Sequence, residues 1–225
     1  TPGSRCAVRP ASPALGADPV YFADPNLEAA VEGQLGLVDP TATDMFLLST
    51  LNADNRGITD LTGLEHARFL RSLDLSGNHI SDVSPLLELR FPQTFNLANN
   101  RIADVSALAN LRTLALLRLD GNQISDISAV SGLTNLTLLD LNDNQIMDIT
   151  AISGLTNLAN LQLHNNLISD ISAVSELTNL TSLFLHNNQI RDISAVVKLT
   201  RLKSLYLYNN QISNISAVTR RVNLT

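Results

Sequence analysis

The stretch LTLLDLNDNQIMDITAISGLTN (residues 136–157) is followed by two near copies of itself, LANLQLHNNLISDISAVSELTN (158–179) and LTSLFLHNNQIRDISAVVKLTR (180–201). The copies recur every 22 residues, and a fixed period of this length indicates a repeat array instead of a single globular core. The same period divides 48–223 into eight repeats and leaves 224–225 as the start of a truncated ninth. The repeats begin at Leu48, Leu70, Pro92, Leu114, Leu136, Leu158, Leu180 and Leu202, and the ninth at Leu224.

Each repeat predicts one short strand and one tight helical turn. Apolar residues occupy places 1, 4, 6, 11, 14, 17 and 20, which in the sixth repeat are Leu158, Leu161, Leu163, Ile168, Ile171, Val174 and Leu177. The alternation at places 4 and 6 favours a strand with one buried face, and the later spacing of three suits a 3₁₀ turn. One unit buries too little apolar surface to fold alone, so we expect the strands to stack into a parallel sheet.

Two polar places also recur. Place 9 is asparagine in seven repeats, and we expect these amides to form a buried ladder that satisfies the backbone: Asn78, Asn100, Asn122, Asn144, Asn166, Asn188 and Asn210. Place 13 is aspartate in seven repeats: Asp60, Asp82, Asp104, Asp126, Asp148, Asp170 and Asp192. These side chains could either bind calcium or cap the turn that follows. Calcium needs six to eight oxygens around one ion, so we favour capping of each turn, for which Asn214 is equally suited.

The pattern LxxLxLxxNxIxDIxxLxxL resembles the leucine-rich repeat of bacterial internalins, from Asp24 to Thr225. DPNLEAAVEGQLG (24–36) followed by NRGITDLTGLE (55–65) also resembles the helical amino-terminal cap of those proteins. The resemblance implies an α/β repeat solenoid: a right-handed leucine-rich-repeat horseshoe with a parallel concave β-sheet, 3₁₀ turns on its convex side and a small cap over 19–47. It further implies a secreted or surface-attached bacterial protein with a protein ligand on the concave face.

The cap can also be derived from the residues. Asp24 is a good helix N-cap, Pro25 suits the first helical position, and Gly36 can end the helix. Thr41 and Asp44 have the spacing of a variant capping box, which predicts a second short helix.

Composition and motifs exclude several classes of protein. Residues 1–18 predict a disordered leader, Cys6 is the only cysteine, and no apolar run is long enough to cross a membrane. The net charge of −6 argues against a nucleic-acid binder. No motif of a nucleophile with its base or of a phosphate-binding loop is present, so we predict no enzyme, cofactor or metal. We expect a monomer unless an uncovered carboxyl-terminal edge pairs.

Places 5 and 7 should face outward from the concave sheet. Along the array the side chains at these places change from polar to aromatic. Asp74, Asp120 and Asp140 lie in this set, and we expect a solvated surface there instead of an acid and base pair. His164 and His186 are one period apart, which suggests either a metal site, for which two nitrogens are too few, or a pH sensor.

The aromatic end of this face is the predicted partner-binding site. Its residues are Phe184, Tyr206, Tyr208, His164, His186, Gln162 and Lys203. Exposed rings are typical of binding hot spots, although ring pairs across strands also stabilise a sheet with no partner. We therefore predict a non-enzymatic protein-interaction module. The alternative is an intracellular scaffold that resembles phosphatase-regulating leucine-rich-repeat proteins of the same period.

Overall fold

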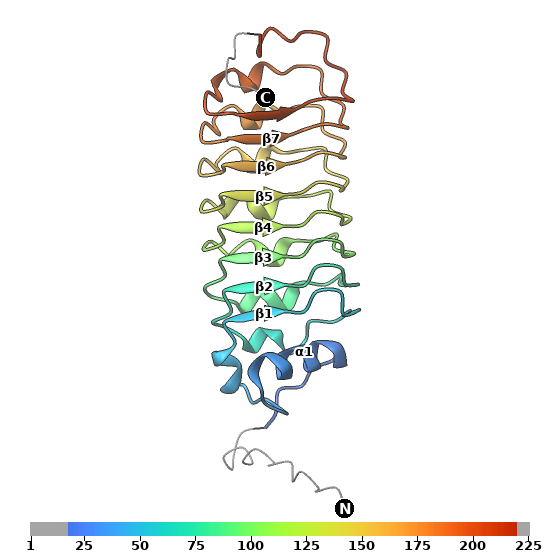
Figure 1. Ribbon diagram of the computed structural model, residues 1–225, viewed down its shortest axis with the longest axis vertical. Helices are drawn as coiled ribbons and strands as arrows, with labels where there is room; N and C mark the ends of the chain where they lie inside the picture. Colours follow the sequence, from blue (N-terminus) through green and yellow to red (C-terminus); the bar gives the residue numbers. More distant parts are fainter. Residues whose placement is uncertain (1–17, 220–225) are drawn as a thin grey trace, which may run out of the picture.

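The computed structural model describes residues 18–219 and shows a column of stacked repeats above a helical cap (Figure 1). Eight parallel strands form one sheet, and every strand pairs with its neighbours in sequence. Each pairing joins residues 22 positions apart, as Leu51 with Leu73, which confirms the predicted period. The strands are β1 (Thr50–Asn52), β2 (Ser72–Asp74), β3 (Thr94–Asn96), β4 (Leu116–Arg118), β5 (Leu138–Asp140), β6 (Asn160–Gln162), β7 (Ser182–Phe184) and β8 (Ser204–Tyr206).

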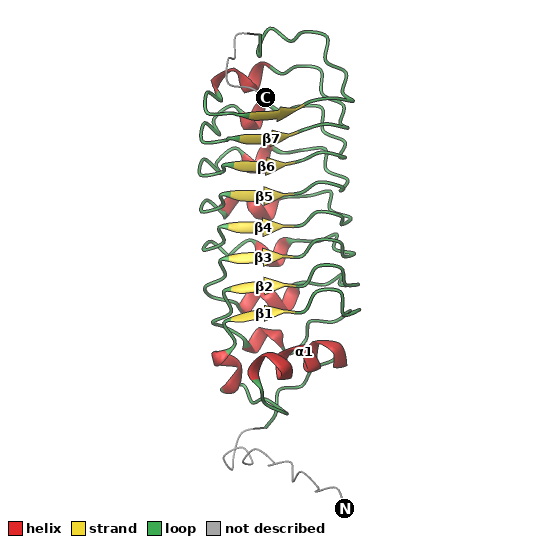
Figure 2. Cartoon of the chain, in the orientation of Figure 1, coloured by secondary structure: helices red, strands yellow, loops and turns green. Residues whose placement is uncertain are grey.

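The helical turns lie behind the sheet in Figure 2 and are 3₁₀, as the spacing of three apolar residues predicts. Asp170 Oδ1 accepts a hydrogen bond of 2.8 Å from the N–H of Ser172, the first residue of its turn. A bond from the N–H two residues on recurs at place 13 of the other repeats, and in repeats two to seven this N–H belongs to the first residue of the turn, which confirms the predicted capping there. The turns are η1 (Asp44–Leu47), η2 (Leu64–His66), η3 (Ser84–Glu88), η4 (Ser106–Leu108), η5 (Ser128–Gly132), η6 (Thr150–Ile152), η7 (Ser172–Val174) and η8 (Ser194–Lys198).

The asparagines at place 9 form the predicted ladder inside the column. Asn166 Nδ2 donates to the carbonyls of Leu141 and Leu163 at 2.9 and 3.1 Å, while its Oδ1 accepts from the N–H of Ile146 at 3.0 Å. Each such amide therefore ties its own repeat to the preceding one. Aliphatic side chains around the ladder form one continuous core along the column.

Place 8 of each repeat lies in the left-handed backbone region, which the sequence analysis did not anticipate. The residues found there are asparagine, aspartate or glycine, the types that tolerate positive φ: Asn55, Gly77, Asn99, Gly121, Asp143, Asn165, Asn187 and Asn209. A Cβ at Gly121 would lie 2.5 Å from Asn99 Oδ1, so any larger residue there would require the Asn99 side chain to move.

The cap begins with α1 (Pro25–Leu35), whose ends match the prediction. Asp24 accepts from the N–H of Asn26 at 2.8 Å, and Gly36 ends the helix with φ 68°. The second oxygen of Asp24 accepts from the N–H and Oγ1 of Thr59 at 2.7 and 3.0 Å. This buried carboxylate thus caps the helix and ties it to the first repeat.

Thr41 and Asp44 form the predicted capping box at the start of η1. The N–H and Oγ1 of Thr41 donate to Asp44 Oδ2 at 2.8 and 2.7 Å. The turn that follows buries Met45, with Leu48 after it, against the first repeat. The predicted leader, apart from Asp18, and the start of the ninth repeat lie outside the described residues, as does Cys6. Within 18–219, the helices are too short and too polar to cross a membrane.

Replacing Asp24 with alanine should lower the free energy of unfolding by about 2 kcal/mol, the upper end of the cost of losing an N-cap, because the link to Thr59 is lost too. Urea unfolding of both chains at neutral pH measures this difference. Asp18→Ala, an exposed carboxylate before the cap, is the control and should change stability by less than about 0.5 kcal/mol. Equal urea midpoints of unfolding for the Asp24→Ala variant and the parent would contradict a stabilising role of the Asp24 hydrogen bonds.

Candidate functional site

Five aromatic rings gather on the open face of the sheet, the face that points away from the aliphatic core. Phe184 ends β7 and Tyr206 ends β8, and their rings stack with centroids 4.8 Å apart. We call Phe184, Tyr206, Tyr208, His164 and His186 the ring surface. The sheet register alone brings the first pair together, since the two residues are direct partners on adjacent strands.

The histidines continue the ring surface two residues beyond the strands. His164 and His186 stack at 4.2 Å, and His186 stacks on Tyr208 at 4.3 Å. The edge of His186 also meets Tyr206 at 6.3 Å, so the two rows of rings form one cluster. Tyr206 and Tyr208 remain 43% and 55% exposed, which leaves aromatic area free for contact with another molecule.

The other two predicted site residues border the cluster. Gln162 ends β6, where it is half-buried between its register partners Asp140 and Phe184. Lys203 is exposed immediately before β8, and its N–H donates to the carbonyl of Thr181 at 2.8 Å. All seven predicted residues thus lie on or next to β6, β7 and β8.

Burial lowers the pKa of both histidines below the usual range, which favours the neutral rings at pH 7. The charge of His164 lowers the pKa of His186 further, whereas Asp143 acts against the shift in both. The Nδ1 atom of each ring is buried and has no hydrogen-bond partner. A neutral aromatic stack is therefore the state presented at neutral pH.

The expectation of a solvated acidic surface is wrong for two carboxylates next to the ring surface, Asp140 and Asp120, which are buried or partly buried. Asp140 is only 6% exposed, because it ends β5 between Arg118 and Gln162 of the adjacent strands. Burial raises the pKa of Asp140 to about 6, with a further contribution from the negative charge of Asp120. Asp120 is also partly buried, and burial raises its pKa. Ala98, at an outward place, is buried as well.

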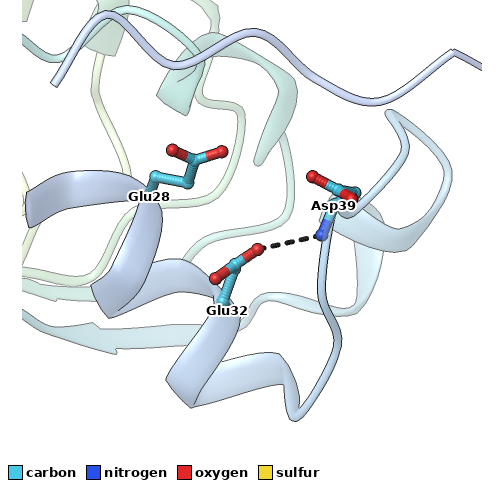
Figure 3. Close-up of side chains that lie close together, drawn as sticks. All are labelled: Glu28, Glu32 and Asp39. Carbon is cyan, nitrogen blue, oxygen red and sulfur yellow. Dashed lines mark hydrogen bonds between the residues drawn. The ribbon is translucent and has the colours of Figure 1, made fainter. Parts of the chain in front are cut away.

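A different acidic group lies in the cap. Glu28, Glu32 and Asp39 bring one carboxylate oxygen each within 4.8 Å of one another, the single group of three or more candidate metal ligands among residues 18–219 (Figure 3). Glu32 Oε1 accepts a 2.9 Å hydrogen bond from the N–H of Asp39, which closes the loop after α1. This bond gives Glu32 a structural role, and an acidic cluster by itself defines no metal site.

A second stack of rings was missed by the sequence analysis. Phe69 stacks on Phe91 with centroids 6.0 Å apart and meets Phe46 edge-on at 5.6 Å, and all three are 44–48% exposed. They lie in η1 and in the loops before β2 and β3, outside the strand places that we analysed. The available signal was the phenylalanine repeated at place 22 of the first two repeats.

Comparisons with known proteins define the class. A profile for leucine-rich repeats in two copies matches residues 134–176 and 178–220, and one for the leucine-rich-repeat domain of the endo-beta-N-acetylglucosaminidase EndoS matches 22–144. The chain is thus a leucine-rich-repeat protein. The comparison with curated proteins found no match.

Solved structures narrow the class. Internalin C2 from Listeria monocytogenes superposes with a TM-score of 0.89 at 35% identity, over 95% of this chain and 97% of that one. InlJ from the same organism shares the fold, with a TM-score of 0.66 at 22% identity over 94% and 57% of the two chains. The chain belongs to the internalin-like leucine-rich-repeat family.

A plant receptor has the same architecture. The leucine-rich-repeat ectodomain of the membrane receptor kinase GASSHO1/SCHENGEN3 from Arabidopsis thaliana, solved in complex with CASPARIAN STRIP INTEGRITY FACTOR 2, matches with a TM-score of 0.65 at 26% identity. The match covers 74% of this chain and 22% of the receptor chain. The fold and these likenesses support a protein-protein interaction module.

Proposed function

We propose that this chain is a non-enzymatic recognition module of a secreted or surface-attached bacterial protein, and that it binds a protein ligand through the ring surface on the concave face of its sheet. The observation that carries the proposal is the cluster of five rings on β7, β8 and the segments that follow β6, β7 and β8. The fold needs no aromatic side chain at these places, because earlier repeats have Asn96, Ala98 and Arg118 there.

Two considerations support a binding role over sheet stabilisation alone, and a third supports the location of the protein. The two tyrosines at the carboxyl-terminal end of the cluster keep about half of their surface exposed, so a partner could bury this aromatic area on binding. Rings have few rotatable bonds, so little conformational entropy is lost when a partner covers them. The likeness to internalin C2 supports the bacterial surface or secreted location.

Replacing Phe184, Tyr206 and Tyr208 together with alanine should weaken binding of the protein ligand at least tenfold, because each ring removes apolar contact area from the centre of the site. The ligand is first captured from extracellular and cytosolic protein pools with the parent chain. Its affinity for the parent and the variant is then measured by calorimetry with purified proteins.

Phe46→Ala with Phe69→Ala and Phe91→Ala is the matched control, since it removes three exposed rings far along the chain from β7 and β8. Both variants must unfold cooperatively before their affinities are compared. Equal affinity of the parent and the ring-surface variant would overturn the proposal. Loss of affinity only in the control would move the binding site to the amino-terminal stack.

A further inference from the structure

The ring surface continues into a pair of carboxylates that have little compensation within the chain. Both lie on the open face: Asp140 ends β5, two strands before β7, and Asp120 follows β4, three strands before β7. Asp140 Oδ1 accepts only a long bond of 3.3 Å from the N–H of Asn142, and the buried Oδ1 of Asp120 has no hydrogen-bond partner. Burying carboxylates in this way is unfavourable unless a cation or donors face them.

Asp74, a carboxylate of the same face, differs because both of its oxygens accept hydrogen bonds from nearby donors. Its Oδ1 accepts from the N–H and Oγ of Ser76 at 3.0 and 2.7 Å, and its Oδ2 accepts from Asn96 Nδ2 at 3.1 Å. Asp120 and Asp140 lack such a set of donors. Within residues 18–219 the two ion pairs join Glu65 with His66 and Glu176 with Lys198, so neither includes this acidic pair.

The local charge is negative. The negative charges of Asp120 and Asp143 raise the pKa of Asp140, and that of Asp143 also raises the pKa of Asp120. Arg118 is the one basic side chain that lowers the pKa of both carboxyls, while His164, whose own burial favours the neutral ring, lowers the pKa of Asp120 alone. Arg118 is exposed, and no ion pair joins it to either carboxylate in the described part of the chain. Three carboxylates against one guanidinium leave a surface that complements an incoming cation.

The distance from the carboxylates to the rings follows from the sheet. Asp140, Gln162, Phe184 and Tyr206 are successive register partners on β5, β6, β7 and β8. Neighbouring strands lie about 4.8 Å apart, so the midpoint of Asp120 and Asp140 lies three strand spacings, about 14 Å, from the midpoint of Phe184 and Tyr206. An extended peptide rises about 3.3 Å per residue and covers this distance in about four residues, and side chains four residues apart point to the same side of such a peptide.

We propose that the open face docks an extended segment of the protein ligand in which a lysine or arginine side chain meets Asp120 and Asp140 while an apolar side chain about four residues away packs on Phe184 and Tyr206. The inference rests on the proposed function and specifies the chemistry of its ligand. A charged hydrogen bond to a carboxylate that is already desolvated is stronger than one to a hydrated surface group. The neighbouring aromatic faces also favour a cation over a neutral side chain.

The probe is the peptide acetyl-Gly-Arg-Gly-Gly-Gly-Phe-Gly-amide, and its control replaces arginine with citrulline, which has nearly the same shape without the charge. Binding to the whole chain is followed through the NMR signals of the His164 and His186 rings, which lie beside both subsites. We expect the arginine peptide to bind at least tenfold more tightly. This preference should fall to less than twofold in the Asp120→Asn, Asp140→Asn double variant.

Asp54→Asn with Asp74→Asn alters two carboxylates at the amino-terminal end of the same face and should leave the tenfold preference intact. Equal binding of the two peptides, an undiminished preference in the Asp120→Asn, Asp140→Asn variant, or no binding of either peptide would each overturn the inference. Measuring how the captured protein ligand binds to both variants distinguishes failure of this inference from failure of the proposed function. A ligand lost by the ring-surface variant but unaffected by the Asp120→Asn, Asp140→Asn variant would sustain the function and reject the cationic subsite.

Discussion

Replacing Asn166 with alanine lowers the free energy of unfolding by about 4 kcal/mol, the largest effect we expect from a single polar side chain here. The amide donates to the carbonyls of Leu141 and Leu163 and accepts from the N–H of Ile146. Alanine leaves the buried N–H of Ile146 without an acceptor and removes the donors that join two repeats. Leaving one such group unsatisfied costs about 1–3 kcal/mol, and the lost bonds contribute about 1 kcal/mol each.

Urea unfolding followed by circular dichroism measures this loss, and hydrogen exchange of the Ile146 N–H gives a second, local reading. The N–H should exchange faster in the variant than in the parent. Asn157→Ala is the matched control: Asn157 is exposed, and its amide donates a single bond of 2.9 Å to the carbonyl of Thr134. Its cost should stay below about 1 kcal/mol. Equal losses in the two variants would contradict the ladder's role.

The ladder was predictable from the sequence because the same residue type, asparagine, recurs at the same place in successive repeats. Asn166 occupies place 9 in a row of seven asparagines, and a buried amide with donors and an acceptor is the residue that the turning backbone needs there. The left-handed residues at place 8 gave a signal of the same kind. Asn165, Asp143 and Gly121 share only their tolerance of positive φ, and this common property could have identified the conformation.

The candidate site was predictable only in part, because burial depends on neighbours instead of on place in the repeat. The ring surface followed from the strand register, which stacks Phe184 on Tyr206 whatever surrounds them. Asp140 and Asn52 both occupy place 5, yet Asp140 is buried and Asn52 is exposed. The longer side chains of Arg118 and Gln162 flank Asp140 on the two adjacent strands, whereas Asn52 lies on the first strand and has Asp74 as its one register partner.

Asp140→Asn should raise the free energy of unfolding at pH 7.5 by about 2–3 kcal/mol. Burial raises the pKa of this carboxyl to about 6 from its ordinary 3.8, and the charge of Asp120 adds to the shift. The folded chain therefore binds this proton more tightly than the unfolded chain does. Stability is lost as the pH rises from about 4 to about 6, and the loss is complete above about pH 7. One unit of pKa corresponds to about 1.4 kcal/mol.

Unfolding of the parent and the Asp140→Asn variant across pH 4 to 8 tests this sign directly. The two should be equally stable near pH 4, where the carboxyl is protonated, and should diverge as it ionises. Asp54→Asn, an exposed carboxylate of the same face, is the control and should change stability at pH 7.5 by less than about 0.5 kcal/mol. A constant gain for Asp140→Asn at every pH would assign the effect to packing instead of charge. A gain confined to neutral pH would mean that the ionised carboxylate destabilises the free protein, which is the condition under which the proposed docking of a cation would be favourable.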